Sequence, residues 1–234
     1  GDPAARPRRG TPRRLGRHGL RSGIQEAVWR AMRRTAFARL IDEEVLTMRS
    51  RSLGVSLMIH GTPLEQKLLD AVLDRFSEKA RGLLEAGSIR VHFLGDRRYK
   101  DVSRALQRLG VDVDAWPVPP AGLFVVEERT AYFRSNDAMT IAHELLHGCD
   151  CALGEGVYFS GFSARWRQAF ARTRGFVTPY AATGLDEAFA ESARALFGIN
   201  TARSPWPDVS PELLRERSPE MAVIIEEVLG DREA

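Results

Sequence analysis

The stretch Ala142-His143-Glu144-Leu145-Leu146-His147 guides the interpretation of the whole chain, because it contains the pattern His-Glu-x-x-His. On a helix, residues four positions apart lie on one face, one turn from each other, so His143 and His147 can reach the same ion. Glu144 follows the first histidine, where a carboxylate can take a proton from a water held by that ion. The stretch therefore predicts a zinc-binding helix with Glu144 as the general base.

The residues around this pattern also favour a helix. Asn136 or Asp137 can cap its start, and Gly148 or Gly154 can end it. Apolar residues recur at helical spacing and predict a buried back for the helix: Ala138, Ile141, Ala142, Leu145 and Cys149.

A zinc hydrolase needs a third protein ligand, and this ligand is not another histidine downstream. The remaining histidines, His18, His60 and His92, all precede the pattern, which excludes the arrangement H-E-x-x-H-x-x-G-x-x-H.

A second helix is predicted over 183–198, with Thr183 as its N-cap and Gly198 at its end. Glu187 and Glu191 are four residues apart and share one face of this helix. We assign Glu187 as the third zinc ligand and Glu191 as the partner that orients one imidazole. Two alternatives stay open: an acidic face in solvent, or Asp186 as the ligand, although it would point about a quarter turn away.

Tyr180 precedes Glu187 by seven residues, and the helix carries the pattern Glu187-Ala-Phe-Ala-Glu191. In this spacing, roughly over residues 120–200, the chain resembles the catalytic domain of anthrax lethal factor and the secreted Pro-Pro endopeptidases. The resemblance implies a zincin-like fold, Zn²⁺ held by His143, His147 and Glu187, and Tyr180 as the phenol that stabilises the tetrahedral intermediate. It also implies a protein or peptide substrate and a secreted or extracellular location, although the chain shows no signal peptide.

Composition is that of an ordinary globular protein, with 44% hydrophobic and 28% charged residues in 234 positions and a net charge of +3. No apolar run approaches the ~18 to 20 residues of a membrane span.

Cys149 and Cys151 are too close in sequence for a relaxed disulfide, so Cys149 is predicted to be a buried thiol. We expect a monomer, and the small net charge makes nucleic acid a poor candidate partner.

Three segments are predicted along the chain. Residues 1–22 form a flexible arm with seven arginines and a single acid, residues 23–50 form a helix, and residues 51–234 form the catalytic domain. Within that domain the patterns predict strands over 53–60, 89–94, 123–126 and 130–134, and helices over 62–84 (started by Thr62), 97–109 (capped by Asp96) and after Ser163, Ser210 and Ser218, with a loop or hairpin over 154–161.

The expected architecture is α+β, with a small, mostly antiparallel sheet beside the zinc helix. In zincins the substrate commonly pairs with an edge strand near that helix, so we expect it along Ala131, Tyr132 and Phe133.

The function predicted from these residues is a zinc-dependent endopeptidase. Two other functions stay open. A non-proteolytic zinc-fold protein would bind a partner and close the coordination sphere of its metal. A DNA-associated metalloprotein would use the basic arm over 1–22.

Overall fold

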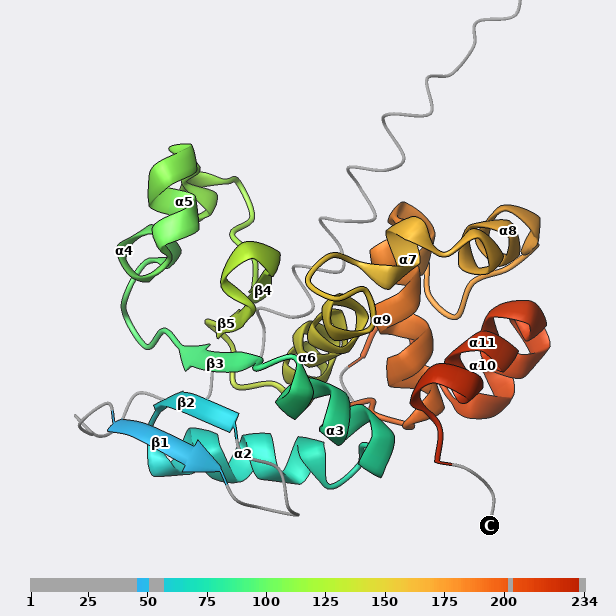
Figure 1. Ribbon diagram of the computed structural model, residues 1–234, viewed down its shortest axis with the longest axis horizontal. Coiled ribbons are helices and arrows are strands. Elements are labelled where there is room, and N and C mark those ends of the chain that lie inside the picture. Colours follow the sequence, from blue (N-terminus) through green and yellow to red (C-terminus); the bar gives the residue numbers. More distant parts are fainter. Residues whose placement is uncertain (1–45, 51–56, 202–203, 232–234) are drawn as a thin grey trace, which may run out of the picture.

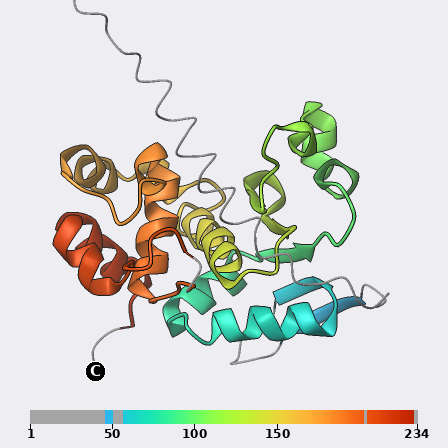
Figure 2. The same cartoon turned by 180° about the vertical axis from the view of Figure 1, so that it is seen from behind.

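A computed structural model describes residues 46–50, 57–201 and 204–231 (Figures 1 and 2). The architecture is α+β, as predicted, with one small sheet and a larger helical part. The long helix α6 (Ala138–Leu153) lies between the sheet and the C-terminal helices. It contacts strands on one side and helix α9 (Leu185–Leu196) on the other, so it joins the two halves of the fold.

The sheet has five strands in the order β1-β2-β3-β5-β4. The outer pairs are antiparallel, while β2 with β3 and β3 with β5 are parallel. The prediction of a mostly antiparallel sheet is therefore wrong, because helices α2 (Pro63–Leu73) and α3 (Glu78–Ala86) return the chain between β2 and β3 in the same direction. The strands are β1 (Leu46–Ser50), β2 (Leu57–Gly61), β3 (Arg90–Phe93), β4 (Gly122–Val125) and β5 (Thr130–Phe133).

Two predicted helices are each divided by an internal serine cap. The first helix, α2, begins after the Thr62 capping box and ends at Leu73. Ser77 then caps the second helix, α3, by accepting a hydrogen bond from the Ala80 N–H. The segment 97–109 is likewise split by Ser103, which caps α5, and Asp96 caps neither helix. These helices are α2 (Pro63–Leu73), α3 (Glu78–Ala86), α4 (Tyr99–Val102) and α5 (Arg104–Leu109).

The loop predicted over 154–161 is present as far as Tyr158, after which a short helix, α7, begins, and the serine caps at 163 and 210 are confirmed. The Ser-Pro pair at 218 likewise opens a helix. The elements are α7 (Phe159–Phe162), α8 (Ala164–Arg172), α10 (Pro211–Arg217) and α11 (Pro219–Leu229). Within the described part of the chain, no helix is both long and apolar enough to cross a membrane.

The N-terminal prediction fails where it can be compared. Residues 46–50 form β1, which pairs with β2 in the same sheet, so the predicted helix over 23–50 is wrong for its last residues. Alternating residues there suit a strand once a neighbouring strand is present, and tertiary pairing overrides a weak helical pattern. The arm over 1–22 and the rest of that helix lie outside the described residues.

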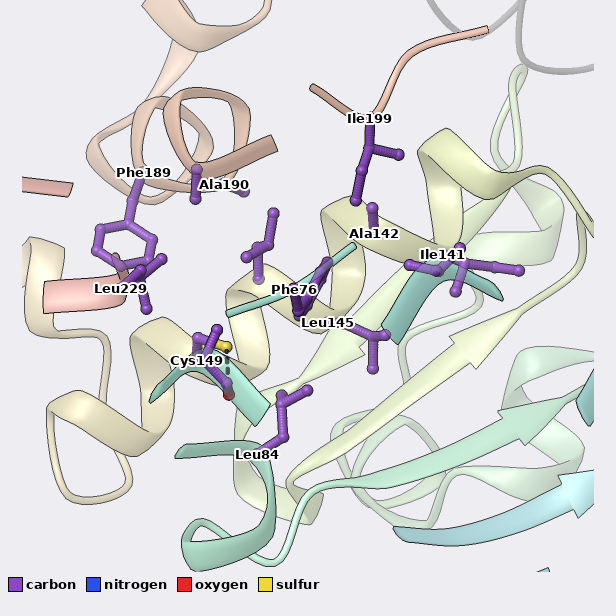
Figure 3. Packing of buried hydrophobic residues seen from close by; sticks show 14 of the residues in the cluster. Phe76, Leu84, Ile141, Ala142, Leu145, Cys149, Phe189, Ala190, Ile199 and Leu229 are labelled. Carbon is purple, nitrogen blue, oxygen red and sulfur yellow. Dashed lines mark hydrogen bonds between the residues drawn. The ribbon is translucent and has the colours of Figure 1, made fainter. Parts of the chain in front are cut away.

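The main core lies around the buried face of α6 (Figure 3). Ile141, Ala142 and Leu145 occupy its centre, and the free thiol of Cys149 is buried there as predicted. Gly148 allows α6 to approach the neighbouring segment closely, because a Cβ at this position would lie 3.1 Å from Ile89 Cγ2. The core thus holds α6 rigidly against the rest of the fold.

Candidate metal centre

Helix α6 presents both histidines of the pattern to one buried point. Asp137 caps the helix by accepting a hydrogen bond from Thr140 N–H, which starts the helix directly after β5. His143, Glu144 and His147 are only 3%, 6% and 5% exposed. Burial of three polar side chains on one turn requires partners for them.

Helix α9 supplies one of these partners. Its N-cap is Gly184 rather than the predicted Thr183, which lies in a short 3-10 helix, η4 (Ala181–Thr183), before it. Gly198 follows the helix with a φ of +60°, a backbone conformation that suits glycine, as predicted for a helix end. Because α9 packs along α6, Glu187 in its first turn faces the histidines.

The three predicted ligands converge. Glu187 Oε2 lies 2.9 Å from His143 Nε2 and 3.4 Å from His147 Nε2. The two Nε2 atoms lie 3.1 Å apart. A tetrahedral zinc with bonds of about 2.0–2.2 Å separates its ligand atoms by roughly 3.3–3.6 Å, so this cluster needs little expansion to hold an ion.

The chemistry of the cluster also fits a cation. The Nδ1 atom of His143 lies 3.0 Å from Glu191 Oε1, a carboxylate that accepts a hydrogen bond from the imidazole. In the neutral imidazole this contact leaves the Nε2 lone pair directed at the Glu187 carboxylate, and two acceptors so close repel each other unless a proton or a metal ion lies between them. The site therefore suits a metal ion held by His143, His147 and Glu187.

The pKa shifts of the clustered side chains also indicate that a positive charge is favoured at this point. Burial opposes the charged form of Glu187, but the hydrogen bonds with His143 and His147 outweigh it and hold its pKa well below the usual range. Burial likewise opposes a charge on His143, yet Glu187 and Glu191 raise its pKa to about 10. Burial raises the pKa of Glu144, against the effect of the two histidines.

Buried hydrogen-bond donors behind the cluster hold the carboxylate of Glu191 in place. Thr178 Oγ1 donates a hydrogen bond of 2.7 Å to Glu191 Oε2, and Arg194 Nε and Nη2 donate bonds of 3.0 and 2.9 Å to its two oxygens. Arg194 Nη1 also donates to the backbone oxygen of Ile199. The predicted contact between Glu191 and one imidazole is thus present, and a buried arginine and threonine support it.

Tyr180 lies at the start of η4 with its hydroxyl at the cluster. It donates a hydrogen bond of 2.8 Å to Glu187 Oε1, and its ring centroid lies 5.5 Å from that of His143. Burial, followed by the charge of Glu187, raises the pKa of the phenol well above its usual range, so it stays a proton donor. The competing ligand Asp186 is not part of the three-residue cluster.

The expectation of a substrate along Ala131, Tyr132 and Phe133 rests on their strand being an edge strand, and this premise is wrong. Ala131, Tyr132 and Phe133 lie in β5, which pairs with β3 on one side and β4 on the other, and all three side chains are buried. The strand at the end of the sheet beside β5 is β4, and its Phe124 backbone donates a hydrogen bond to Glu144. The sequence pattern predicted the two strands of the hairpin, but it did not indicate which of them lies at the edge of the sheet.

No protein-family model matches the chain, and no curated protein matches its sequence. Among solved structures, the Pro-Pro endopeptidase PPEP-2 from Paenibacillus alvei is similar over 74% of this chain and 97% of that one, with a TM-score of 0.50 and 16% identity. The chain has a zincin-like fold. At this identity the likeness concerns the fold alone.

Three residues of this candidate site, Tyr158, Thr178 and Arg194, are not among the predicted ones. Tyr158 follows α6, and its ring centroid lies 5.5 Å from that of His147 and 6.4 Å from that of Phe124. The Tyr158 ring therefore lies between the predicted metal ligand His147 and the edge strand β4. Arg194 supports Glu191 from three residues along α9. That spacing is visible in the sequence, but it is equally typical of an exposed ion pair.

The Arg194–Glu191 pair should be important for the stability of the zincin-like domain. Both side chains are almost fully buried, so Arg194→Met would leave a buried carboxylate without its partner and should lower the free energy of unfolding by about 3–5 kcal/mol. Urea unfolding would measure the change. The matched control is Arg215→Met, which breaks the exposed pair with Glu226 and should cost less than about 1 kcal/mol. Equal losses in the two variants would contradict the role given to Arg194.

Proposed function

We propose that this protein is a zinc-dependent endopeptidase. The observation that carries the proposal is the convergence of His143, His147 and Glu187 on one point, with Glu144 beside it and next to the edge strand. The zincin-like fold shared with a Pro-Pro endopeptidase supports it.

Each residue of the site has a role in this hydrolysis. When bound, Zn²⁺ acts as a Lewis acid toward water and the scissile carbonyl. Glu144 takes a proton from the attacking water and passes it to the leaving amine, a task that suits a buried carboxyl with a raised pKa. Tyr180 donates a hydrogen bond to the oxygen that becomes negative in the transition state. Glu191 keeps His143 in the tautomer and orientation that bind metal.

The substrate would lie along β4 rather than β5. Among the described residues no strand pairs with the outer side of β4, and an extended peptide can add itself to such an edge by backbone hydrogen bonds. Phe124 on β4 contacts Glu144, so a peptide placed there passes the general base. Tyr158 borders the same place next to His147.

Gly122 on β4 makes this arrangement testable. A Cβ at this position would lie 2.6 Å from Glu144 Cγ and 2.8 Å from Thr140 Cγ2, so Gly122→Ala must displace the general base. We expect cleavage to fall by roughly 10²-fold, the cost of a small misplacement of a catalytic group, with metal content unchanged. Gly161→Ala, where a Cβ meets nothing within 4 Å, is the control. Full activity of Gly122→Ala would argue against the position given to Glu144.

The experiment that tests the function is a cleavage profile against a diverse peptide library. The protein is assayed with zinc, after removal of metal by a chelator, and after zinc is restored. Cuts that disappear with the chelator and return with zinc are expected, and their sequences would give the specificity. Proline around the cut would indicate a Pro-Pro endopeptidase.

An absence of cuts with one zinc bound per chain would instead favour a non-proteolytic zinc protein that binds a partner. The DNA-associated alternative depends on the arm over 1–22, which lies outside the described residues.

A further inference from the structure

A cavity of about 750 Å³ lies on the opposite face of the sheet from the metal centre. The side chains of Val91 and Ala131 point to the core around α6, whereas their strand neighbours His92 and Tyr132 point the other way, toward α5. Figure 1 shows α4 and α5 on the other side of β3 from α2 and α3. The volume is in the range of sites for small molecules.

Three aromatic side chains from adjacent strands form the floor of this cavity. His60, His92 and Tyr132 are direct cross-strand neighbours on β2, β3 and β5. Their rings follow one another with centroid distances of 5.0 and 5.4 Å. The Nε2 atom of His92 is buried and has no hydrogen-bond partner among the described residues. A buried polar atom without a partner is costly, so a ligand that supplied a hydrogen bond to this nitrogen would be favoured.

Arginines surround the floor, and their charges are only partly neutralised. Arg90 Nη2 donates a hydrogen bond of 2.7 Å to the backbone oxygen of Glu128, which carries no full charge. The Arg104 side chain makes no hydrogen bond or ion pair within the described part of the chain. Arg108 pairs with Glu127. Two guanidinium charges at the cavity, those of Arg90 and Arg104, therefore have no carboxylate partner among the residues that the structure describes.

The remaining acid in the lining, Glu128, forms no ion pair with Arg90 or Arg104 among the described residues, although its negative charge acts on the cavity. Its carboxylate accepts hydrogen bonds from Ser103 Oγ at 2.8 Å, Tyr132 OH at 2.7 Å and the Ala105 N–H at 3.0 Å. These donors hold the carboxylate to the start of α5. Burial is the main cause that lowers the pKa of His92 to about 4; the charges of Arg97, His60 and Arg90 lower it further, and that of Glu128 opposes them.

We propose that this cavity binds a small phosphate-bearing molecule through Arg90, Arg104 and His92. Guanidinium groups bind phosphate oxygens with paired N–H donors, and a neutral imidazole nitrogen can accept a hydrogen bond from a phosphate hydroxyl or donate one to a phosphate oxygen. The site is separate from the metal centre and does not depend on peptidase activity.

The test is a titration of the full chain with inorganic phosphate, in which the NMR signals of its five histidines are monitored at each phosphate concentration. Sodium chloride at matched ionic strength corrects for screening. The signals of His60 and His92 should shift and saturate at one phosphate per chain. The double variant Arg90→Gln/Arg104→Gln should bind at least 10-fold more weakly. Arg104→Gln alone should already weaken binding, and it should disturb folding least because the Arg104 side chain makes no hydrogen bond or ion pair among the described residues.

Matched variants locate the effect. Arg167→Gln/Arg172→Gln removes two exposed arginines from α8 and should leave the titration unchanged, as should His147→Ala at the metal centre. Acetate should bind much more weakly than phosphate. The proposal is overturned if the His60 and His92 signals do not respond to phosphate, if acetate binds equally well, if the arginine variants titrate like the wild type, or if His147→Ala abolishes binding.

Discussion

Replacing Glu144 with glutamine should reduce peptide cleavage by about 10³-fold, because general acid–base groups of this kind contribute roughly 10²–10⁴ to the rate. Glutamine has nearly the same shape and can still accept the hydrogen bond from the Phe124 backbone, but it cannot take a proton from water. The helix and the three metal ligands should be undisturbed. The rate with a cleaved library peptide and the zinc content of the purified variant would be measured together.

The control for this variant is Glu85→Gln, an exposed glutamate on α3, for which we expect wild-type cleavage. A Glu144→Gln protein that keeps zinc and cleaves at the wild-type rate would rule out Glu144 as the general base. A variant that loses zinc would place Glu144 among the groups that hold the metal, contrary to the ligand set proposed here.

His147→Ala should remove both zinc and cleavage. It deletes one of three converging ligand atoms, so metal affinity should fall by more than the 10–100-fold typical of changes in the groups around a metal site. Binding to the folded state stabilises it: zinc at about 100 times its dissociation constant adds roughly 2.7 kcal/mol to the free energy of unfolding. We therefore expect zinc to raise the melting temperature of the wild type but not of His147→Ala.

Glu144→Gln is the matched comparison for this experiment, since it lies on the same helix and should still be stabilised by zinc. Stabilisation of His147→Ala to the same degree as the wild type would show that the metal binds elsewhere in the chain. Chelator treatment of the wild type gives the reference for a metal-free protein with every side chain intact.

The candidate site was largely predictable because it depends on local spacing. The interval between His143 and His147 places both imidazoles on one face of any helix, and the interval between Glu187 and Glu191 does the same for the carboxylates. Local chemistry also predicted helix starts well, as at Thr62, Ser163 and Ser210, where a side-chain oxygen accepts a backbone N–H close in sequence. Breaks inside helices were missed because Ser77 and Ser103 can be either cap or helix interior.

Strand order could not be predicted in the same way. The hairpin of β4 and β5 is a local feature, but only the pairing of β5 with the distant strand β3 makes β5 internal and leaves β4 at the edge. The two strands have similar apolar patterns, and nothing in these patterns indicates which of them will pair with a second strand. For this reason the expectation that residues 131–133 form an edge strand is wrong.

The sequence by itself determined the helical frame of the metal centre and the chemical types of its ligands, since both follow from residues within a few positions of each other. Only the tertiary structure decided which strand borders Glu144, that Arg194 is a buried support of Glu191 rather than a surface charge, and that His60, His92 and Tyr132 meet across three strands. Each of these depends on contacts between segments far apart in the chain, and such contacts are set by packing of the whole core rather than by the spacing of neighbours.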